Sequence, residues 1–270
     1  MKLVTVFFDF EAPFLWKDEG QFDLEATALK INEVLKKYKV KAAFNTCGVV
    51  TEKFPKSISM LHDEGHEIAS HGYAHENFLK VSAAELDSIL ARTERVFQSV
   101  IGRKPVGIRA PWLKVNEAVY GVLRNRNYSW ASNRYTPFWA TKSHVDFGDA
   151  SHLRFMLGRT VYAIKRFSQR EKPFREGSIV EIPLLSPLDI YCIYPFPEAR
   201  ENSPESSLEE AYRILVRHYE SSKAYFNLNF HEHVIGTANR IQLLEKILGY
   251  LREQSDASFV LPTQIVSSLS

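Results

Sequence analysis

The chain of 270 residues alternates short apolar runs with longer amphipathic segments, and this alternation limits its fold more than any other feature. Residues 3–8 are typical of a strand, apolar residues at helical spacing predict a helix over 24–38, and strand composition returns at 40–45. The repetition of such units favours a parallel sheet covered by helices, either as an open sheet or as a closed barrel.

The later segments continue this pattern. Helices are predicted over residues 57–64, 83–100, 117–125, 207–220 and 240–254, strands over 67–70, 106–108, 128–131, 178–185 and 225–230, and a closing segment over 258–267. Reactive side chains directly follow several strands: Asp9, His71, Arg109 and His231. Barrel enzymes build their sites at this end of the strands, so we expect a barrel, in a single domain over residues 1–270.

The alternation stops between residues 134 and 177, over a stretch too long for an ordinary connection, which we interpret as an insertion. Residues 153–167 mix apolar side chains with cations, as a basic amphipathic helix does. The cations are Arg154, Arg159, Lys165 and Arg166. Such a helix either packs over the barrel with its cations in solvent or contacts an anionic partner, such as a membrane surface or an acidic glycan.

Composition narrows the class of protein. Hydrophobic residues make up 45% and charged residues 24%, as in soluble globular proteins, and a net charge of +2 argues against a nucleic-acid binder. Cys47 and Cys192 lack the spacing of metal ligands, so we expect two reduced core residues. The chain opens on a strand without a signal-peptide pattern and contains no apolar run of membrane-spanning length, so we expect a cytoplasmic location.

Two histidines four residues apart, His71 and His75, could bind one divalent metal ion. A third ligand would come from the first strand, where Asp9 and Glu11 point the same way because residues i and i+2 of an extended segment share a face. Two histidines and one carboxylate suit Zn²⁺ or a similar ion and leave positions open for water and substrate. The second carboxylate could then act as a general base. An isolated pair of histidines would also fit an ordinary surface turn.

Two further segments carry chemistry. Arg109 could hold a carboxylate through a bidentate pair, while Trp112 offers an aromatic face to a sugar ring. His231 could protonate a leaving amine, or it could be a capping or core residue. The remaining histidines have no comparable partners, and we interpret them as structural: His62, His66, His144, His152, His218 and, with the least support, His233.

The order of these motifs resembles the NodB-homology polysaccharide deacetylases, carbohydrate esterase family 4. The shared features are a first-strand Asp, His-x-x-x-His, Arg-x-Pro and a strand-end His. The resemblance implies a distorted (β/α)₇ barrel and metal-dependent removal of an acyl group, usually acetyl from an amino sugar. It also implies residue roles: Asp9 as base, Arg109 as its orienting partner, His71 and His75 as metal ligands, Pro111 and Trp112 in the substrate groove, and His231 as acid, with Phe230 or Leu228 near the acyl methyl.

The chain departs from the commonest family pattern at two positions. Phe10 replaces the second of two adjacent aspartates, so the chain looks like an Asp-x-Glu branch in which Glu11 binds the metal. Ala131 lies near the position where many relatives carry the Asp that tunes the acid histidine, so we expect His231 to be less strongly oriented.

We therefore expect a metal-dependent hydrolase that deacetylates an N-acylated sugar, in a glycan or in a lipid-linked or nucleotide-linked precursor. Two alternatives remain open. Without a metal ligand at Glu11, the protein would resemble the metal-independent hydrolases of ureides such as allantoin, or a deformylase. A barrel that has lost catalysis could instead bind glycan through Trp112 and neighbouring aromatic residues.

Overall fold

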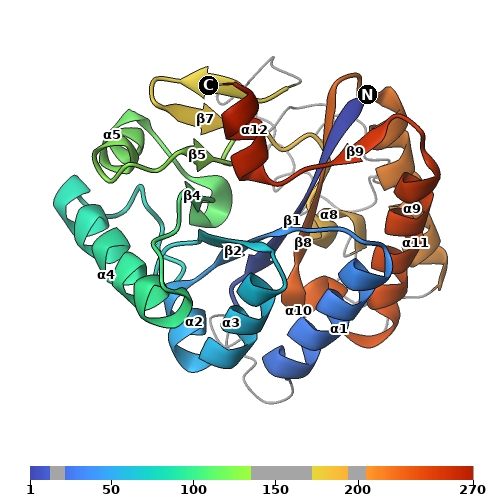
Figure 1. Ribbon diagram of the computed structural model, residues 1–270, viewed down its shortest axis with the longest axis horizontal. Coiled ribbons are helices and arrows are strands. Elements are labelled where there is room, and N and C mark those ends of the chain that lie inside the picture. Colours follow the sequence, from blue (N-terminus) through green and yellow to red (C-terminus); the bar gives the residue numbers. More distant parts are fainter. Residues whose placement is uncertain (13–21, 135–171, 194–204, 270) are drawn as a thin grey trace, which may run out of the picture.

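The computed structural model describes residues 1–12, 22–134, 172–193 and 205–269 (Figure 1). Its strands form one curled sheet in the order β6-β7-β5-β4-β3-β2-β1-β8, with β9 paired to β1. The strands are β1 (Lys2–Phe10), β2 (Ala43–Thr46), β3 (Glu67–Ser70), β4 (Gly107–Ile108), β5 (Trp130–Ala131), β6 (Phe174–Glu176), β7 (Ile179–Glu181), β8 (Tyr225–His231) and β9 (Ala257–Phe259). All neighbours in this order pair in parallel except β6 and β7, which leaves the seven parallel strands of a distorted (β/α)₇ barrel.

Side chains span the gap between β7 and β8. Asn227 donates through Nδ2 to the carbonyl oxygen of Pro183 at 3.0 Å, and its Oδ1 accepts from the backbone N–H of Leu185 at 2.9 Å. A single β-bridge joins Leu188 to Asn229. Two buried asparagines of β8 thus substitute for the ladder that an undistorted barrel would have at this seam.

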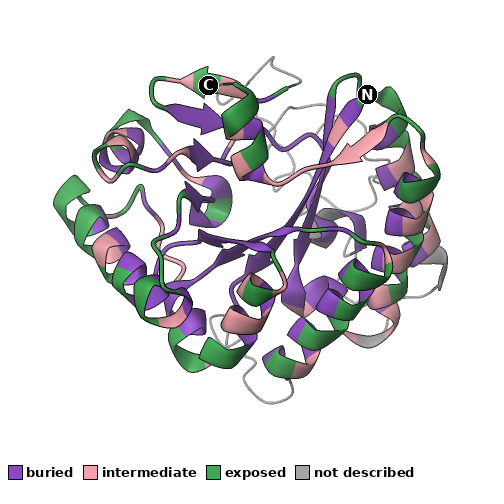
Figure 2. Ribbon diagram, in the orientation of Figure 1, coloured by how far each residue is buried: buried purple, intermediate pink, exposed green. Residues whose placement is uncertain are grey.

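Helices cover the outside of the sheet. They are α1 (Leu24–Lys37), α2 (Gly48–Lys53), α3 (Pro55–Asp63), α4 (Ala83–Ile101), α5 (Glu117–Asn125), α8 (Asp189–Ile193), α9 (Glu205–Ser221), α10 (Glu232–Ile235), α11 (Ile241–Glu253) and α12 (Pro262–Ser268), with 3₁₀ turns at Pro111–Leu113 and Ala238–Arg240. Figure 2 shows buried strands surrounded by helices whose outer faces are exposed. Most helices therefore bury one apolar stripe against the sheet.

The alternation of side chains along β1 separates two cores. Phe8 and Phe10 point outward into the large cluster beneath the helices, whereas Phe7 points into the barrel and contacts Trp130, with ring centroids 5.9 Å apart. Asp9 is two residues from Phe7 and shares its inward direction. The first strand thus delivers Asp9 to the inside of the barrel at the end where the strands finish.

The same alternation along β8 corrects one expectation. Phe230 lies in the outer core, where its ring centroid is 5.6 Å from that of Phe8, and only 1% of it is exposed. Leu228 is buried in the same cluster. Because successive strand residues face opposite sides, neither side chain shares the inward face of His231, and the expected contact of Phe230 with an acyl methyl is wrong.

The end of the predicted insertion, residues 172–177, is part of the sheet and not of an insertion. Residues 172–177 include β6, which pairs antiparallel with β7, so this end of the segment belongs to the sheet. The predicted basic helix over 153–167 lies outside the described residues. Cys47 and Cys192 are free and buried, as expected. Among the residues that the structure describes, no helix is long and apolar enough to cross a membrane.

Gly107 is required by the packing inside the barrel. A Cβ built on Gly107 would lie 1.7 Å from Cε2 of Trp130, whereas one built on Gly121, in α5, meets nothing within 4 Å. We expect Gly107→Ala to lower the free energy of unfolding by about 1–3 kcal/mol through overpacking. Gly121→Ala should raise it by up to about 1 kcal/mol through helix propensity. Urea unfolding measures both, and equal stability of the two variants would contradict this packing.

Candidate metal and catalytic site

Three predicted metal ligands meet at the end of the barrel where β1 and β3 finish. Nε2 of His75 lies 2.6 Å and Nε2 of His71 lies 3.5 Å from Oε2 of Glu11. One ligand atom from each of these residues lies within 4.8 Å of the other two. Burial alone would raise the pKa of Glu11, but hydrogen bonds with His71 and His75 outweigh it, and the pKa lies well below its usual range. An ionised carboxylate and two imidazoles are therefore available to one cation.

The backbone between the two histidines is held in a tight loop. His71 extends β3, because its backbone N–H donates to the carbonyl oxygen of Thr46 at 2.9 Å. The carboxylate of Glu76 then accepts from the backbone N–H groups of Tyr73, at 3.0 Å, and Ala74, at 2.9 Å. His75 has a φ of 59°, in the left-handed region that non-glycine residues seldom adopt. The loop turns both rings toward Glu11 at the cost of this backbone strain.

Asp9 is held apart from the cluster of Glu11, His71 and His75 by other partners. Its Oδ1 accepts from Nδ2 of Asn45 at 2.7 Å and from Nη1 of Arg109 at 2.9 Å, while its Oδ2 lies 4.0 Å from Nε2 of His231. Burial opposes ionisation, but the Arg109 charge and nearby histidines outweigh it and lower the pKa of Asp9. Asp9 is therefore an ionised carboxylate paired with Arg109, whereas Glu11 is the carboxylate that lies against the two histidines.

Arg109 is completely buried and donates four hydrogen bonds from its side chain. Besides Asp9, it bonds the carbonyl oxygen of Ser132 at 3.3 Å, the Ser132 hydroxyl at 3.1 Å and Oδ1 of Asn229 at 2.9 Å. Its own carbonyl oxygen accepts from Nδ1 of His71 at 2.7 Å. This bond fixes the His71 tautomer and leaves the Nε2 lone pair for a metal.

His231 is oriented by a residue that the sequence did not reveal. Nδ1 of His231 donates to Oδ1 of Asp189 at 2.7 Å, and the backbone N–H of His231 donates to Oδ2 at 2.7 Å. Burial would lower the pKa of this imidazole, but Asp189 and then Glu11 and Asp9 raise it to about 10. The expectation of a weakly oriented His231 is therefore wrong, because Asp189 after β7 does what an Asp near Ala131 would do.

The Arg-Ala-Pro-Trp turn presents an aromatic side chain beside the metal ligands. Trp112 has a φ of 60°, and half of it is exposed, while its ring centroid lies 5.0 Å from that of His75. Pro111 is buried at the start of the turn, and Oδ1 of Asn133 accepts from the backbone N–H of Ala110 at 2.7 Å. Of the two predicted groove residues, Trp112 is thus the exposed one.

Comparison with known families agrees with this arrangement. A sequence model of the polysaccharide deacetylases matches residues 12–131, a range that includes His71, His75 and Arg109. Residues 12–131 therefore carry the sequence pattern of the polysaccharide deacetylases. Asp9, Glu11 and His231 lie outside the matched range, so their assignment rests on the geometry above.

Two curated relatives match somewhat less than half of this chain. A peptidoglycan-N-acetylglucosamine deacetylase of Bacillus cereus is 35% identical over 117 residues, which cover 43% of this chain and 39% of the relative. A peptidoglycan deacetylase of Helicobacter pylori is 27% identical over 124 residues, which cover 44% and 42%. The matches span less than half the length of either relative.

Solved structures extend the likeness of fold to nearly the whole chain. A Mycobacterium smegmatis protein, provisionally assigned as a polysaccharide deacetylase, has a TM-score of 0.74 at 20% identity and covers 99% of this chain and 89% of its own. An allantoinase has a TM-score of 0.68 at 13% identity, covering 98% and 89%. At such identities these likenesses show that the chain and these proteins share a fold.

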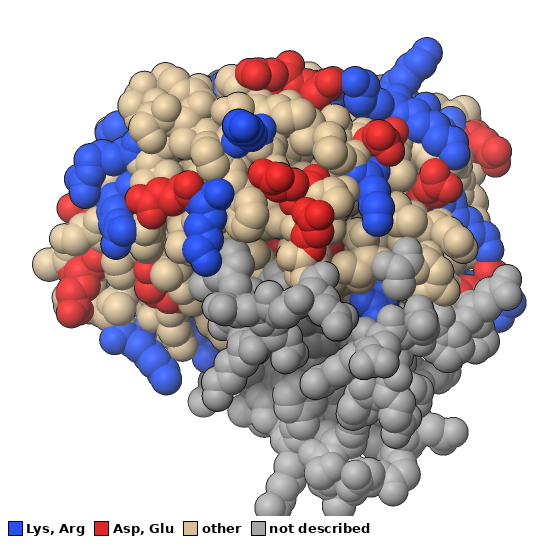
Figure 3. All heavy atoms as spheres, turned by 90° about the horizontal axis from the view of Figure 1, so that it is seen from below, with Lys and Arg blue, Asp and Glu red and all other residues tan. Residues whose placement is uncertain are grey.

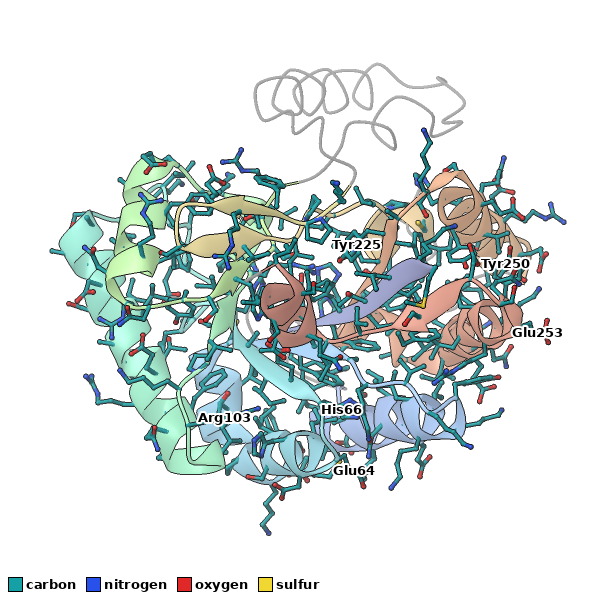
Figure 4. All side chains as sticks on the ribbon, turned by 45° about the horizontal axis from the view of Figure 1, so that its top comes forward. Glu64, His66, Arg103, Tyr225, Tyr250 and Glu253 are labelled. Carbon is teal, nitrogen blue, oxygen red and sulfur yellow. The ribbon has the colours of Figure 1, made fainter. Side chains whose placement is uncertain are left out.

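The other end of the barrel holds a separate pocket of about 360 Å³, lined among others by His66, Glu67 and Arg103. Figure 4 turns this end, where the strands begin, toward the reader and labels His66 and Arg103. Nδ1 of His66 accepts from the backbone N–H of Ala42 and Nε2 contacts Oδ1 of Asn32, while Glu67 binds Trp130 and Thr263. Burial lowers the pKa of His66 to about 4. His66 is a structural residue, as expected.

The pairing of Asp189 with His231 predicts a pH dependence. The pKa of His231 is about 10 in the folded protein, against an ordinary value of 6.5. The stabilisation of the folded state by protonated His231 is therefore full below pH 6.5 and is lost as the pH rises through 10. In Asp189→Asn the pKa of His231 should fall, and the loss of stability between these pH values should shrink. NMR titration of the imidazole in chelator-treated protein measures the pKa, with exposed Asp63→Asn as the control. An unchanged pKa in Asp189→Asn would contradict the assignment.

Proposed function

We propose that this chain is a metal-dependent hydrolase that removes the acetyl group from an N-acetylated sugar of a glycan such as peptidoglycan. The observation that carries the proposal is the convergence of Glu11, His71 and His75 beside an ionised Asp9 and a protonated His231. This set provides a cation site, a base and an acid for cleavage of an amide bond.

The donor set supports Zn²⁺ as the metal. Two imidazole nitrogens and one carboxylate oxygen match the ligands of catalytic zinc sites, and the His71 ring is already oriented by the Arg109 carbonyl oxygen. A divalent ion held by these three residues would polarise the acyl oxygen and lower the pKa of a coordinated water to about 7.

The protein side chains divide the proton transfers between them. Asp9, held ionised by Arg109, accepts a proton from the attacking water. His231, held protonated by Asp189, donates a proton to the departing amine nitrogen, which would otherwise leave as an unstable anion. Arg109 keeps Asp9 in place and does not itself exchange a proton.

The exposed face of Trp112 supports a sugar as substrate, because apolar sugar faces stack on aromatic rings. Figure 3 views the molecule from the side toward which β1 runs. On that face the described residues carry Lys and Arg interspersed with Asp and Glu, so neither charge dominates. The curated relative from Bacillus cereus is named for a neutral N-acetylated sugar, N-acetylglucosamine, and a sugar of this kind is the substrate proposed for the chain.

The alternatives have less support. A metal-independent ureide hydrolase was expected only if Glu11 could not bind a metal, and Glu11 lies between the two histidines. A non-catalytic glycan-binding barrel would not need an ionised Asp9 opposite a protonated His231. The cytoplasmic location, the lipid-linked or nucleotide-linked substrates and the membrane contact of residues 153–167 stay predictions from the sequence.

The metal assignment is tested by His71→Ala, with His62→Ala at the opposite end of the barrel as its matched control. We expect His71→Ala to lose bound zinc and to stop releasing acetate from N-acetylglucosamine oligomers, because one of three protein ligands is gone. His62→Ala should retain both. Elemental analysis measures the bound zinc, and an acetate assay measures the activity. Equal zinc content in His71→Ala and wild type would refute the metal site at Glu11, His71 and His75.

The role of Asp9 is separable from that of the ligands. Asp9→Asn should keep its zinc but lose activity by a factor of about 10²–10⁴, the usual contribution of a general base. Metal content and turnover are measured on the same sample. Loss of zinc in Asp9→Asn would instead make Asp9 a ligand, and full activity after exhaustive chelation would favour the metal-independent alternative.

A further inference from the structure

The first strand ends in an unusual backbone conformation directly after Glu11. Ala12 has a φ of 55°, in the left-handed region, and its side chain is fully buried in the outer core. A non-glycine residue seldom adopts this conformation unless neighbouring groups hold it there. The direction in which Glu11 leaves β1 therefore depends on what holds Ala12.

The ladders on both sides of β1 stop just before this point. The β1–β2 side ends with the backbone N–H of Cys47 donating to the carbonyl oxygen of Phe10 at 3.1 Å. The β1–β8 pairing ends at Asp9 opposite His231. Beyond this pair, the backbone N–H of Ala12 donates to the side chain of Glu232, at 2.5 Å from Oε1. A carboxylate thus continues the strand pairing where the backbone of β8 turns into α10.

Glu232 is fixed on a rigid element. Its side chain is fully buried, and α10 packs closely on α1, since a Cβ on Gly236 would lie 2.3 Å from Cγ2 of Thr27. The second oxygen of Glu232, Oε2, makes no hydrogen bond within the described part of the chain and lies 3.7 Å from Nδ1 of His233. The hydrogen bond to Ala12 and the ion pair with His233 together compensate the burial of this carboxylate, and the hydrogen bond holds Oε1 at the Ala12 amide.

We propose that Glu232 is a positioning residue that acts through the Ala12 amide to aim the Glu11 carboxylate at His71 and His75. The inference rests on the proposed function, because it takes Glu11 as a metal ligand. It also accounts for the Asp-x-Glu arrangement of this chain. Glu11 lies two residues beyond Asp9, past the last pair of the β1–β8 ladder, so a contact outside the ladder must fix its position. Glu232, the residue after His231, supplies that contact through the Ala12 amide. The dipeptide His231-Glu232 therefore provides the proposed acid and also orients a proposed metal ligand.

The experiment compares zinc affinity, by competition with a chromophoric chelator, among variants of Glu232 in the full chain. Glu232→Met removes the acceptor at similar volume, and Glu232→Asp keeps the charge but withdraws it from Ala12. Both should weaken zinc binding by about 10–100-fold, the usual effect of losing a partner that orients a metal ligand. Glu232→Gln keeps an acceptor oxygen and should bind zinc as wild type does. The Co²⁺ absorption spectrum should change in the first two variants only.

The matched control is Glu67, another buried carboxylate, which binds Trp130 and Thr263 at the opposite end of the barrel. Glu67→Met should destabilise the metal-free protein but leave zinc affinity unchanged. Wild-type affinity and an unchanged Co²⁺ spectrum in both Glu232→Met and Glu232→Asp would overturn the proposal. Absence of zinc binding by the wild-type protein would instead overturn the proposed function.

Discussion

The buried guanidinium of Arg109 is the constraint on which the rest of the site depends. A charge with no exposure to solvent is tolerated only when acceptors surround it, and removal of one partner of a buried ion pair costs about 3–5 kcal/mol. The acceptors come from β1, from the segment after β5 and from β8, while the carbonyl oxygen of Arg109 binds His71. The hydrogen bonds of this one cation therefore fix the mutual positions of Asp9, His71 and the ends of five strands.

Opposite partners then separate the protonation states of the groups in the site. Asp9 faces a cation and keeps a low pKa, whereas His231 faces Asp189 and holds its proton to about pH 10. Two titratable groups 4.0 Å apart are thus driven to the states of base and acid. The proposed chemistry follows from the ionised Asp9, the protonated His231 and the cluster of Glu11, His71 and His75. The fold alone does not specify this chemistry, because an allantoinase shares the fold.

Local periodicity predicted those parts of the site that depend on one strand or loop. The shared direction of Asp9 and Glu11 follows from the i, i+2 rule, and the same rule, applied to β8, excludes Phe230 from the face of His231. Asp189 and Glu232 could not be found in this way, because each acts on a residue distant in sequence and only the curled sheet brings them together. The long apolar runs of β1 and β8 predicted these strands close to their observed bounds, whereas β6 falls in the segment that the sequence indicated as an insertion.

Anomalous X-ray diffraction at the zinc edge, on crystals grown with Zn²⁺, tests the central claim most directly. The account predicts one peak at about 2.0–2.2 Å from Nε2 of His71, from Nε2 of His75 and from a carboxylate oxygen of Glu11. Asp9 should remain bound to Arg109. A peak coordinated by Asp9 in place of Glu11, or no peak near the two histidines, would contradict it.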